Sequence, residues 1–304
     1  MVQDTTDIDL TCPNQQVKGV GPLEYDARHD VFFHPLLAFN SHGLPLGVAW
    51  QKSWTRNKIR KKHTKKERDD WHRKTPIEGK ESFRWIEGMR AARDVAEACP
   101  RTTCVCIADS DADVYELFCE SRSTSRGEMH FLVRACQNRN TRAPDTNLLD
   151  ATRGTPCLFQ CSVTTLPIDN PEQVQQIVSY YSIRWQIEIH FRTLKSGCRI
   201  ENRQFETLDR LLNCLAVYSI IAWKIMYLCH LGRECPDLDC EIIFKRSNGE
   251  PIFRCLDRIV LDRLRIFVKR KFSDESRGSR RLGGDRSDRL GLYRLSKARI
   301  SWSG

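Results

Sequence analysis

The segment that decides the expected fold reads Tyr181-Ser-Ile-Arg184-Trp-Gln-Ile-Glu188-Ile-His-Phe-Arg-Thr-Leu-Lys195. It lies in a stretch without Gly or Pro, from Glu172 to Ser196, which predicts one helix. Its polar residues are spaced Y-x2-R-x3-E-x6-K. At about 100° per residue, these side chains fall within an arc of roughly 60°. One helical stripe therefore carries a phenol, a guanidinium, a carboxylate and an ammonium.

The chemistry of this stripe suits the end of a nucleic-acid strand. Its phenol, guanidinium and ammonium can bind phosphate, and its carboxylate can hold a divalent metal ion beside them. The alternative is a solvated helix face of paired charges. The same segment also holds apolar residues that leave little of the helix facing solvent: Trp185, Ile187, Ile189, Phe191 and Leu194. Taken alone, the helix leaves both interpretations open.

Charge is the main feature of the composition. The chain has 304 residues and a net charge of +10. Lys and Arg are concentrated in residues 52–74 and 263–299. An acidic polymer is a natural partner for such a protein, although many basic proteins bind no nucleic acid. The basic cluster at residues 58–68 fits either a solvated loop or a source of non-specific phosphate contacts.

The 14 cysteines are interpreted as free thiols. The N-terminus shows no apolar leader, and no stretch approaches the roughly eighteen uninterrupted apolar residues of a membrane-spanning helix. The longest apolar stretch, residues 211–231, is interpreted as a core helix. The cysteine spacings lack the paired C-x2-C knuckle of a structural zinc site. We expect a protein of the reducing cytoplasm with no membrane segment.

Alternating and helical patterns predict the order of elements. A first strand carries Asp4, and residues 31–39 and 45–54 form a hairpin around the turn at 40–44. Pro35 suggests an edge strand or a bulge. Residues 80–99 and 112–120 are expected to be helices, and residues 103–108 and 129–135 strands. The order is three strands, a helix, a strand, a helix and a strand, followed by the helix that carries the polar stripe.

The stripe resembles the motif of the cut-and-paste bacterial transposases of the IS-four family (Tn-five-like), where the Glu is the last acid of a DDE triad. Asp4-Thr5-Thr6 is similar to the family's first acidic phrase. Cys104-Val-Cys-Ile-Ala108, running into Asp109-Ser-Asp-Ala112-Asp113, is similar to the second. Shorter matches follow in order: Lys80-Glu81-Ser82 with Trp85, Val133-Arg134, and Glu201-Asn-Arg203-Gln-Phe. The resemblance runs from about residue 2 to about residue 244.

The resemblance implies a ribonuclease H-like mixed sheet flanked by helices, with a helical C-terminal region. In such a sheet the strand ends bring distant acids together. Asp4 is expected in the middle of the first strand, Asp109 at the end of the fourth, and Glu188 on a helix packed against the same sheet end. These acids are implied to be catalytic and to bind Mg²⁺, with Mn²⁺ as a substitute, because clustered carboxylates repel one another unless a cation lies between them.

Each aspartate also has a structural alternative. Asp4 could cap a turn together with its threonine neighbours. Asp109 could be the N-cap of the following helix. Asp113 is interpreted only as an acid that favours the N-terminal end of that helix.

The resemblance also implies an activity and its partners. Water would free a 3′-OH at the transposon end, this hydroxyl would form a hairpin that water reopens, and the 3′-OH would finally join target DNA. Two metal ions about 3.5–4 Å apart serve such steps. Double-stranded DNA is the expected partner, and a homodimer is expected through the C-terminal helices. The residues implied to bind DNA are Tyr181, Arg184, Lys195 and Arg134.

The sequence departs from the family in three places. No DNA-recognition domain precedes Asp4. The β-rich insertion is short, and Gln160 falls near the position of the family's base-stacking Trp, which an amide cannot replace. Residues 245–304 lose the resemblance, and 273–289 have the composition of a disordered segment. This tail fits either a basic DNA-contacting segment or the remnant of a shifted reading frame.

These departures divide the chain and limit the expected function. We expect the first part of the core at 1–140, the insertion remnant at 141–170, the completing helix at 171–204, a helical region at 205–244 and the divergent tail at 245–304. The expectation is a truncated transposase core whose activity is open. The alternatives are a metal-dependent nuclease of the same fold and a non-catalytic inhibitor that binds DNA or pairs with an intact transposase.

Overall fold

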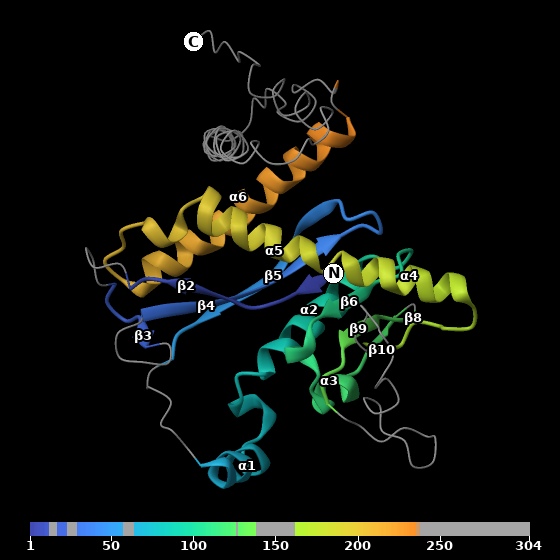
Figure 1. Ribbon diagram of the computed structural model, residues 1–304, viewed down its shortest axis with the longest axis horizontal. Coiled ribbons are helices and arrows are strands. Elements are labelled where there is room, and N and C mark those ends of the chain that lie inside the picture. Colours follow the sequence, from blue (N-terminus) through green and yellow to red (C-terminus); the bar gives the residue numbers. More distant parts are fainter. Residues whose placement is uncertain are drawn as a thin grey trace, which may run out of the picture.

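The computed structural model describes residues 1–11, 17–22, 29–56, 64–125, 127–137, 162–235 and Asp237, and shows a mixed sheet flanked by helices (Figure 1). The strands of the sheet are β1 (Val2–Gln3), β2 (Thr6–Asp9), β3 (Gly21–Pro22), β4 (His29–Phe39), β5 (Pro45–Trp54), β6 (Val105–Ala108), β9 (His130–Arg134) and β10 (Ser162–Thr164). A separate ribbon pairs β7 (Ser123–Thr124) with β8 (Gly127–Glu128).

The helices are α1 (Lys65–Lys74), α2 (Phe83–Ala98), α3 (Tyr115–Cys119), α4 (Pro171–Ser182), α5 (Trp185–Arg192) and α6 (Leu208–Glu234). Short helical turns lie between them: η1 (Ile77–Gly79), η2 (Ser110–Ala112), η4 (Thr193–Gly197) and η5 (Ile200–Asn202). Several predicted features lie outside the described residues: most of the basic cluster, the greater part of the insertion remnant with Gln160, and the tail 245–304.

The strand order confirms the predicted ribonuclease H-like arrangement. β1 and β2 pair one after the other with the same edge of β4, and β5 pairs with the opposite edge of β4. β6 lies parallel to β1, and β9 lies parallel to β6. An antiparallel hairpin therefore precedes two parallel strands. The hairpin has the expected form, since β5 occupies the predicted residues 45–54 and β4 begins only two residues before the predicted position 31.

Each face of the sheet carries its own apolar core. The first core joins one face to α5, η4 and α6, and includes Val2, Ile107, Leu132, Ile187 and Leu215. The second joins the other face to α2 and α3, and includes Leu36, Trp85, Cys106, Ala108 and Val133. Because successive strand residues point to opposite faces, neighbours such as Ile107 and Ala108 belong to different cores.

The prediction that Asp4 lies in the middle of a strand is wrong, because the strand is interrupted there. β1 ends at Gln3 and β2 begins at Thr6, yet both keep one register against β4, with Gln3 opposite Leu36 and Thr6 opposite Phe33. That register places Asp4 opposite Pro35. In this register Leu10 lies opposite His29, and its N–H donates to the His29 carbonyl. Hydrogen-bonded pairs of an antiparallel ladder recur at every second residue, so the bonded positions include residues 10, 8, 6 and 4. Asp4 therefore falls at a bonded position where Pro35 has no N–H to donate.

Pro35 itself was expected on an edge strand or at a bulge. β4 is instead an interior strand, with β1 and β2 on one side and β5 on the other, so the edge interpretation is wrong. A register shift against β5 does follow at Leu36/Leu37. The interrupted strand accommodates the missing donor, because Asp4 lies outside β1 and β2 and only the Pro35 carbonyl is left to bond there.

The two predicted helices next to the acids are also divided. Residues 112–120 form the end of η2 and the separate helix α3. The long helix is split into α4, α5 and the π-helical turn η4. Between α4 and α5 the backbone bonds span three residues, as where Arg184 N–H donates to Tyr181 C=O at 3.0 Å. In η4 they span five residues, as where Cys198 N–H donates to Thr193 C=O at 2.8 Å. These local changes of pitch move Lys195 out of the regular stripe.

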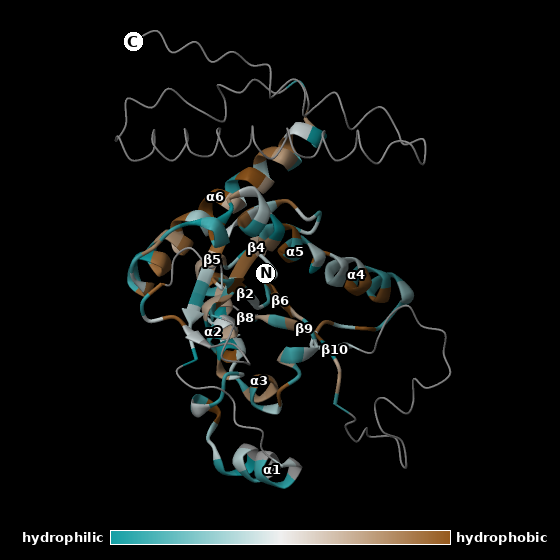
Figure 2. Cartoon of the chain, turned by 60° about the vertical axis from the view of Figure 1, so that its left-hand side comes forward, coloured by the Kyte–Doolittle hydropathy of each residue, from teal (hydrophilic) through white to brown (hydrophobic). Residues whose placement is uncertain are grey.

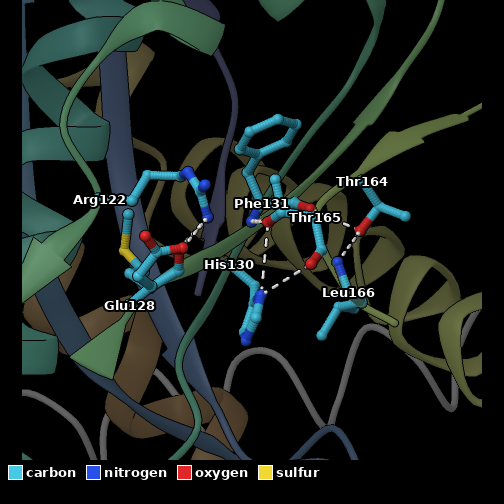
Figure 3. Close-up of polar contacts among 8 residues, drawn as sticks. Arg122, Glu128, His130, Phe131, Thr164, Thr165 and Leu166 are labelled. Atoms are coloured by element: carbon cyan, nitrogen blue, oxygen red, sulfur yellow. Dashed lines mark hydrogen bonds and ion pairs between the residues drawn. The ribbon is translucent and has the colours of Figure 1, made fainter. Parts of the chain in front are cut away.

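The chain returns to the sheet through β10, which is bonded to β9 by side chains as well as by the ladder (Figure 3). The Thr164 hydroxyl donates to the Phe131 carbonyl at 2.7 Å, and the Thr165 hydroxyl accepts from Phe131 N–H at 3.2 Å. His130 Nδ1 lies 3.1 Å from the Thr165 carbonyl. These bonds fix the start of the segment that leads into α4.

Helix α6 crosses the first core, where Trp223 Nε1 donates to the Pro45 carbonyl at 3.0 Å. Figure 2 shows hydrophobic residues recurring along this helix, with hydrophilic ones between them. Within the described residues α6 alone is long and apolar enough to cross a membrane, and 44% of its most apolar window is buried. Its packing against β5 and η4 agrees with the predicted core helix. Cys104, Cys106 and Cys198 are buried thiols that form no disulfide.

Candidate active site

Strand register aligns three of the predicted residues across the sheet. Val2 lies opposite Ile107 in the parallel β1–β6 pair, so the same register places Asp4 beside Asp109. Ala108 lies opposite Val133 in the parallel β6–β9 pair, which places Asp109 beside Arg134. Residues aligned across a sheet point to the same face. This row therefore faces α4 and α5, which carry Tyr181 and Glu188, and Arg184 at the N-cap of α5.

Asp4 is the buried member of the row, with 8% of its surface exposed. Burial, followed by the negative charge of Asp109, raises the pKa of Asp4 to about 7; the Thr5 amide and Arg184 oppose this rise, and Glu188 adds to it. Its Oδ1 accepts from Thr5 N–H at 2.7 Å, and its Oδ2 accepts from Arg184 Nη1 at 2.9 Å. The carboxylates of Asp109 and Glu188 thus lie close enough to raise the pKa of Asp4.

Asp109 directly follows β6, as predicted, and also has the capping role considered as its alternative. Its side chain accepts from Asp111 N–H at 3.0 Å and caps η2. Asp113 was expected to favour the start of the next helix. It instead accepts from the N–H groups of Cys136 and Gln137, each at 2.7 Å, and so fixes the chain after β9. The 3₁₀ turn places Asp113 at the end of η2 rather than at a helix start.

Arg184 links Asp4 to the acid on α5. Its Nη1 lies 2.9 Å from Asp4 Oδ2 and 3.9 Å from Glu188 Oε1. The Glu188 side chain is 45% exposed, so it can reach toward solvent or toward Asp4. Arg184 and Glu188 therefore lie on one side of the helical segment, as predicted. The Arg184 guanidinium lies between the carboxylates of Asp4 and Glu188.

The remaining predicted DNA-binding residues fall into two groups. The positive charges of Arg184 and Arg134 act on Tyr181 and partly offset the rise in its pKa, which burial causes. Arg134 Nη2 also donates to Ser110 Oγ at 2.9 Å. Tyr181, Arg184 and Arg134 are thus brought together. Lys195 is not part of this group, because its ammonium lies 3.4 Å from Asp7 and 3.6 Å from Glu201.

Trp185 lies beside this group, although no functional role was predicted for it. The expectation that the apolar residues leave little of the helix facing solvent holds for Ile187, Phe191 and Leu194. It fails for Trp185 and Ile189, which are 65% and 41% exposed. The Arg184 guanidinium carbon lies 5.2 Å from the centre of the Trp185 ring. The only sequence signal for this exposure was its position directly after Arg184, because successive helical residues are rotated by about 100° and so do not share a face.

Among the described residues, no three metal-ligating side chains lie close enough together to hold an ion. The donor set nevertheless fits a divalent cation such as Mg²⁺, which prefers carboxylate oxygens. The raised pKa of Asp4 shows that its negative charge is disfavoured there, and a cation would relieve this. At present the Arg184 guanidinium supplies positive charge at the same place.

Comparison with known proteins identifies the class. Residues 45–223 match a family model described as a transposase DDE domain, and this span exceeds half of the chain. The chain therefore belongs to the transposase DDE domain family. Asp109 and Glu188 lie inside the matched span, and Asp4 lies before it. Divalent metal ions are generally used by domains of this family.

A comparison with curated proteins gives no match. Among solved structures, the chain is similar to a piggyBac transposase in a synaptic complex with hairpin DNA, at 8% sequence identity and a TM-score of 0.43. The match covers 100% of this chain and 59% of that chain. The chain therefore spans less than two thirds of that transposase.

Proposed function

We propose that this chain is the catalytic core of a cut-and-paste DNA transposase, in which Asp4, Asp109 and Glu188 are the catalytic acids. The observation that carries the proposal is the state of Asp4. Its pKa is raised to about 7 by burial and by the charges of the other two acids, against the opposing effect of Arg184. A carboxyl held in this way near neutral pH is typical of a functional site.

The same three carboxylates are proposed to hold the divalent metal, Mg²⁺ or Mn²⁺ in its place. When bound, the metal would supply an activated oxygen nucleophile and stabilise the leaving oxygen of the phosphodiester. The protein contributes the geometry. Asp4 and Asp109 directly follow the neighbouring parallel strands β1 and β6, and Glu188 is free to adjust from the exposed side of α5.

Double-stranded DNA, comprising transposon ends and target, is the proposed substrate. Tyr181, Arg184 and Arg134 surround the acids and are proposed to bind the phosphates next to the bond that reacts. Lys195, on the β2 side, would bind a phosphate farther along the strand. The net charge of +10 supports the same partner through non-specific attraction.

A homodimer through the C-terminal helices is also proposed. On α6, Val217 and Ile220 are 43% and 47% exposed, although much of the rest of this helix is buried. Exposed apolar residues on one helix are suited to pairing with a second copy. Such a protein would act in the cytoplasm of a bacterial cell, as part of an insertion sequence.

The proposal is tested with the purified full chain, Mg²⁺ or Mn²⁺, and a labelled DNA duplex with a pre-cut end. We expect cleavage or joining by the native protein. In Glu188→Gln, which keeps the shape of the side chain and removes its charge, the rate should fall by on the order of 10²–10³, the scale seen for groups that stabilise reacting charge.

Three other outcomes separate the rival functions. Cleavage without any joined product would indicate a nuclease of the same fold. A folded protein that binds DNA but leaves it intact would indicate a non-catalytic inhibitor. Equal activity in the native protein and Glu188→Gln would show that Glu188 is not a catalytic acid, and would contradict the proposed triad.

A further inference from the structure

Directly behind Asp4, on the opposite face of the sheet, lies a chain of buried hydrogen bonds. Arg84 Nε donates to Thr5 Oγ1 at 2.8 Å. Thr5 Oγ1 lies 2.8 Å from His34 Nδ1, and His34 Nε2 lies 3.1 Å from Gln3 Oε1. Gln3 Nε2 in turn donates to the Trp85 carbonyl at 3.3 Å. The chain thus runs from α2 through β1 and β4 and back to α2.

The direction of every bond in this chain is fixed. The Trp85 carbonyl only accepts, so the Gln3 amide nitrogen faces it and the Gln3 oxygen faces His34. That oxygen also only accepts, so His34 carries its proton on Nε2. Nδ1 is then the acceptor for the Thr5 hydroxyl. Burial, reinforced by the positive charges of Arg84 and Lys52, lowers the pKa of His34 and keeps the ring neutral.

These bonds stand where the backbone ladder is interrupted. The register that places Asp4 opposite Pro35 places Thr5 opposite His34. Pro35 cannot donate to the first strand, so of the two ladder bonds expected between Asp4 and Pro35 only the one accepted by the Pro35 carbonyl can form. The side-chain bond between Thr5 and His34 joins the two strands at this point. Thr5 N–H is then directed at Asp4 Oδ1, which it meets at 2.7 Å.

The absence of a side chain at position 88 makes room for the chain of bonds. Gly88 lies on α2, and a Cβ there would overlap Gln3 Oε1 and lie 3.6 Å from His34 Nε2. The ring of His34 also meets the edge of Trp85, with 4.6 Å between ring centres. Its plane and its tautomer are therefore set by packing and by hydrogen bonds together.

We propose that Thr5, His34, Gln3 and Arg84 form a positioning network that holds the Asp4 carboxylate in its metal-binding orientation. This inference rests on the proposed function of Asp4. The Thr5 side chain is held from both sides, by Arg84 and by His34. Its peptide N–H therefore points in one direction, and one oxygen of Asp4 is fixed while the other faces Arg184 on the α5 side.

The matched pair Thr5→Val and Thr5→Ser tests this role. Valine keeps the shape and removes the hydroxyl, whereas serine keeps the hydroxyl. Mn²⁺ binding to the full chain, without DNA, is measured by electron paramagnetic resonance. We expect Thr5→Val to weaken binding about tenfold, the lower end of the effect of supporting bonds around metal ligands, and Thr5→Ser to stay near the native value. A folded Thr5→Val protein that binds Mn²⁺ as tightly as the native chain would overturn the proposal.

A second variant covers the case in which Thr5→Val does not fold. Gly88→Ala displaces the Gln3 amide without touching the hydroxyl or Asp4. We expect weaker Mn²⁺ binding and loss of the ¹⁵N resonance pattern of the Nε2-protonated His34 ring. Loss of that pattern with native Mn²⁺ affinity would overturn the role in positioning Asp4.

The failure of the proposed function would be visible separately. If the native chain binds no Mn²⁺, the metal role of Asp4 is wrong. The ¹³C resonance of the Asp4 carboxyl at constant pH then decides the positioning role. A change in Thr5→Val but not in Thr5→Ser would support it, and no change in either would overturn it.

Discussion

The face of the sheet that carries Asp4 is crowded with charge, whereas on the opposite face the polar side chains of Gln3, Thr5 and His34 are hydrogen-bonded to one another. Asp4 on the α5 face lies among two other acids and one guanidinium. On the α2 face, Gln3 and Thr5 belong to a closed series of bonds around His34. These residues are neighbours in one interrupted strand. Alternation along a strand thus separates a reactive carboxyl from the groups that hold it in place.

The largest expected effect comes from neutralising the crowded face with Asp4→Asn. Cleavage should fall by on the order of 10²–10³, as expected for a group that organises reacting charge. The free energy of unfolding of the metal-free protein should rise above pH 7, although activity falls. The folded-state pKa of Asp4 is raised from 3.8 to about 7, so its contribution to stability is present below pH 3.8 and is lost as pH rises through about 7.

Without metal, Asp4→Asn should therefore be more stable than the native protein above pH 7, by a few kcal/mol at about 1.4 kcal/mol per pKa unit. Near pH 4 the difference should disappear, because the native carboxyl is then neutral when folded. Urea unfolding at several pH values measures both. A variant that is less stable at pH 8 would show that the Arg184 contact outweighs the burial of the charge.

The second effect concerns the opposite face. Trp85 is 1% exposed and packs against the His34 ring, so Trp85→Ala should lower the free energy of unfolding by about 3–5 kcal/mol. Trp185→Ala is the matched control on the α5 face. Since that indole is 65% exposed, its removal should change stability by less than about 0.5 kcal/mol. Equal losses in the two variants, measured by chemical denaturation, would refute the contrast between the faces.

The smallest effect is expected at Lys195, on the margin of the charged face. Its contacts with Asp7 and Glu201 are partly exposed, so Lys195→Ala should cost less than about 1 kcal/mol of stability. The slope of the logarithm of DNA affinity against the logarithm of salt concentration should decrease in magnitude by about one, which is the contribution of one phosphate contact. Arg210→Ala, which removes a solvent-exposed pair with Glu206, is the control. Fluorescence anisotropy would contradict the phosphate role if both variants kept the native slope.

Much of the fold followed from local patterns. The hairpin of β4 and β5 was predicted because its alternation is bounded by a turn, and α2 because its apolar residues recur at helical spacing and Pro100 follows. The division of the long helix into α4, α5 and η4 was not predictable from the sequence. Nothing between Tyr181 and Lys195 breaks a helix by composition, and the changes of pitch arise where the segment packs across the sheet and α6.

For the site, the sequence and the resemblance indicated which residues matter but not how they are arranged. The order of the strands determines that Arg134 lies beside Asp109, and this depends on pairing between segments far apart in the chain. The role of His34 had no local signal, because a histidine in an apolar strand is more often a core residue. Its importance comes from Pro35, whose missing N–H matters only once Asp4 is seen to lie opposite it.

The position of Arg184 between Asp4 and Glu188 has a consequence for the order in which partners arrive. The Arg184 guanidinium that neutralises Asp4 is also the proposed phosphate ligand, so a DNA phosphate would compete with Asp4 for it. If DNA draws Arg184 away, Asp4 loses its internal counter-ion, and a divalent cation gains affinity for the site. Thermodynamic reciprocity then requires the cation to tighten DNA binding by the same factor. Substrate and metal would act as mutual effectors, with a single arginine as the link between them.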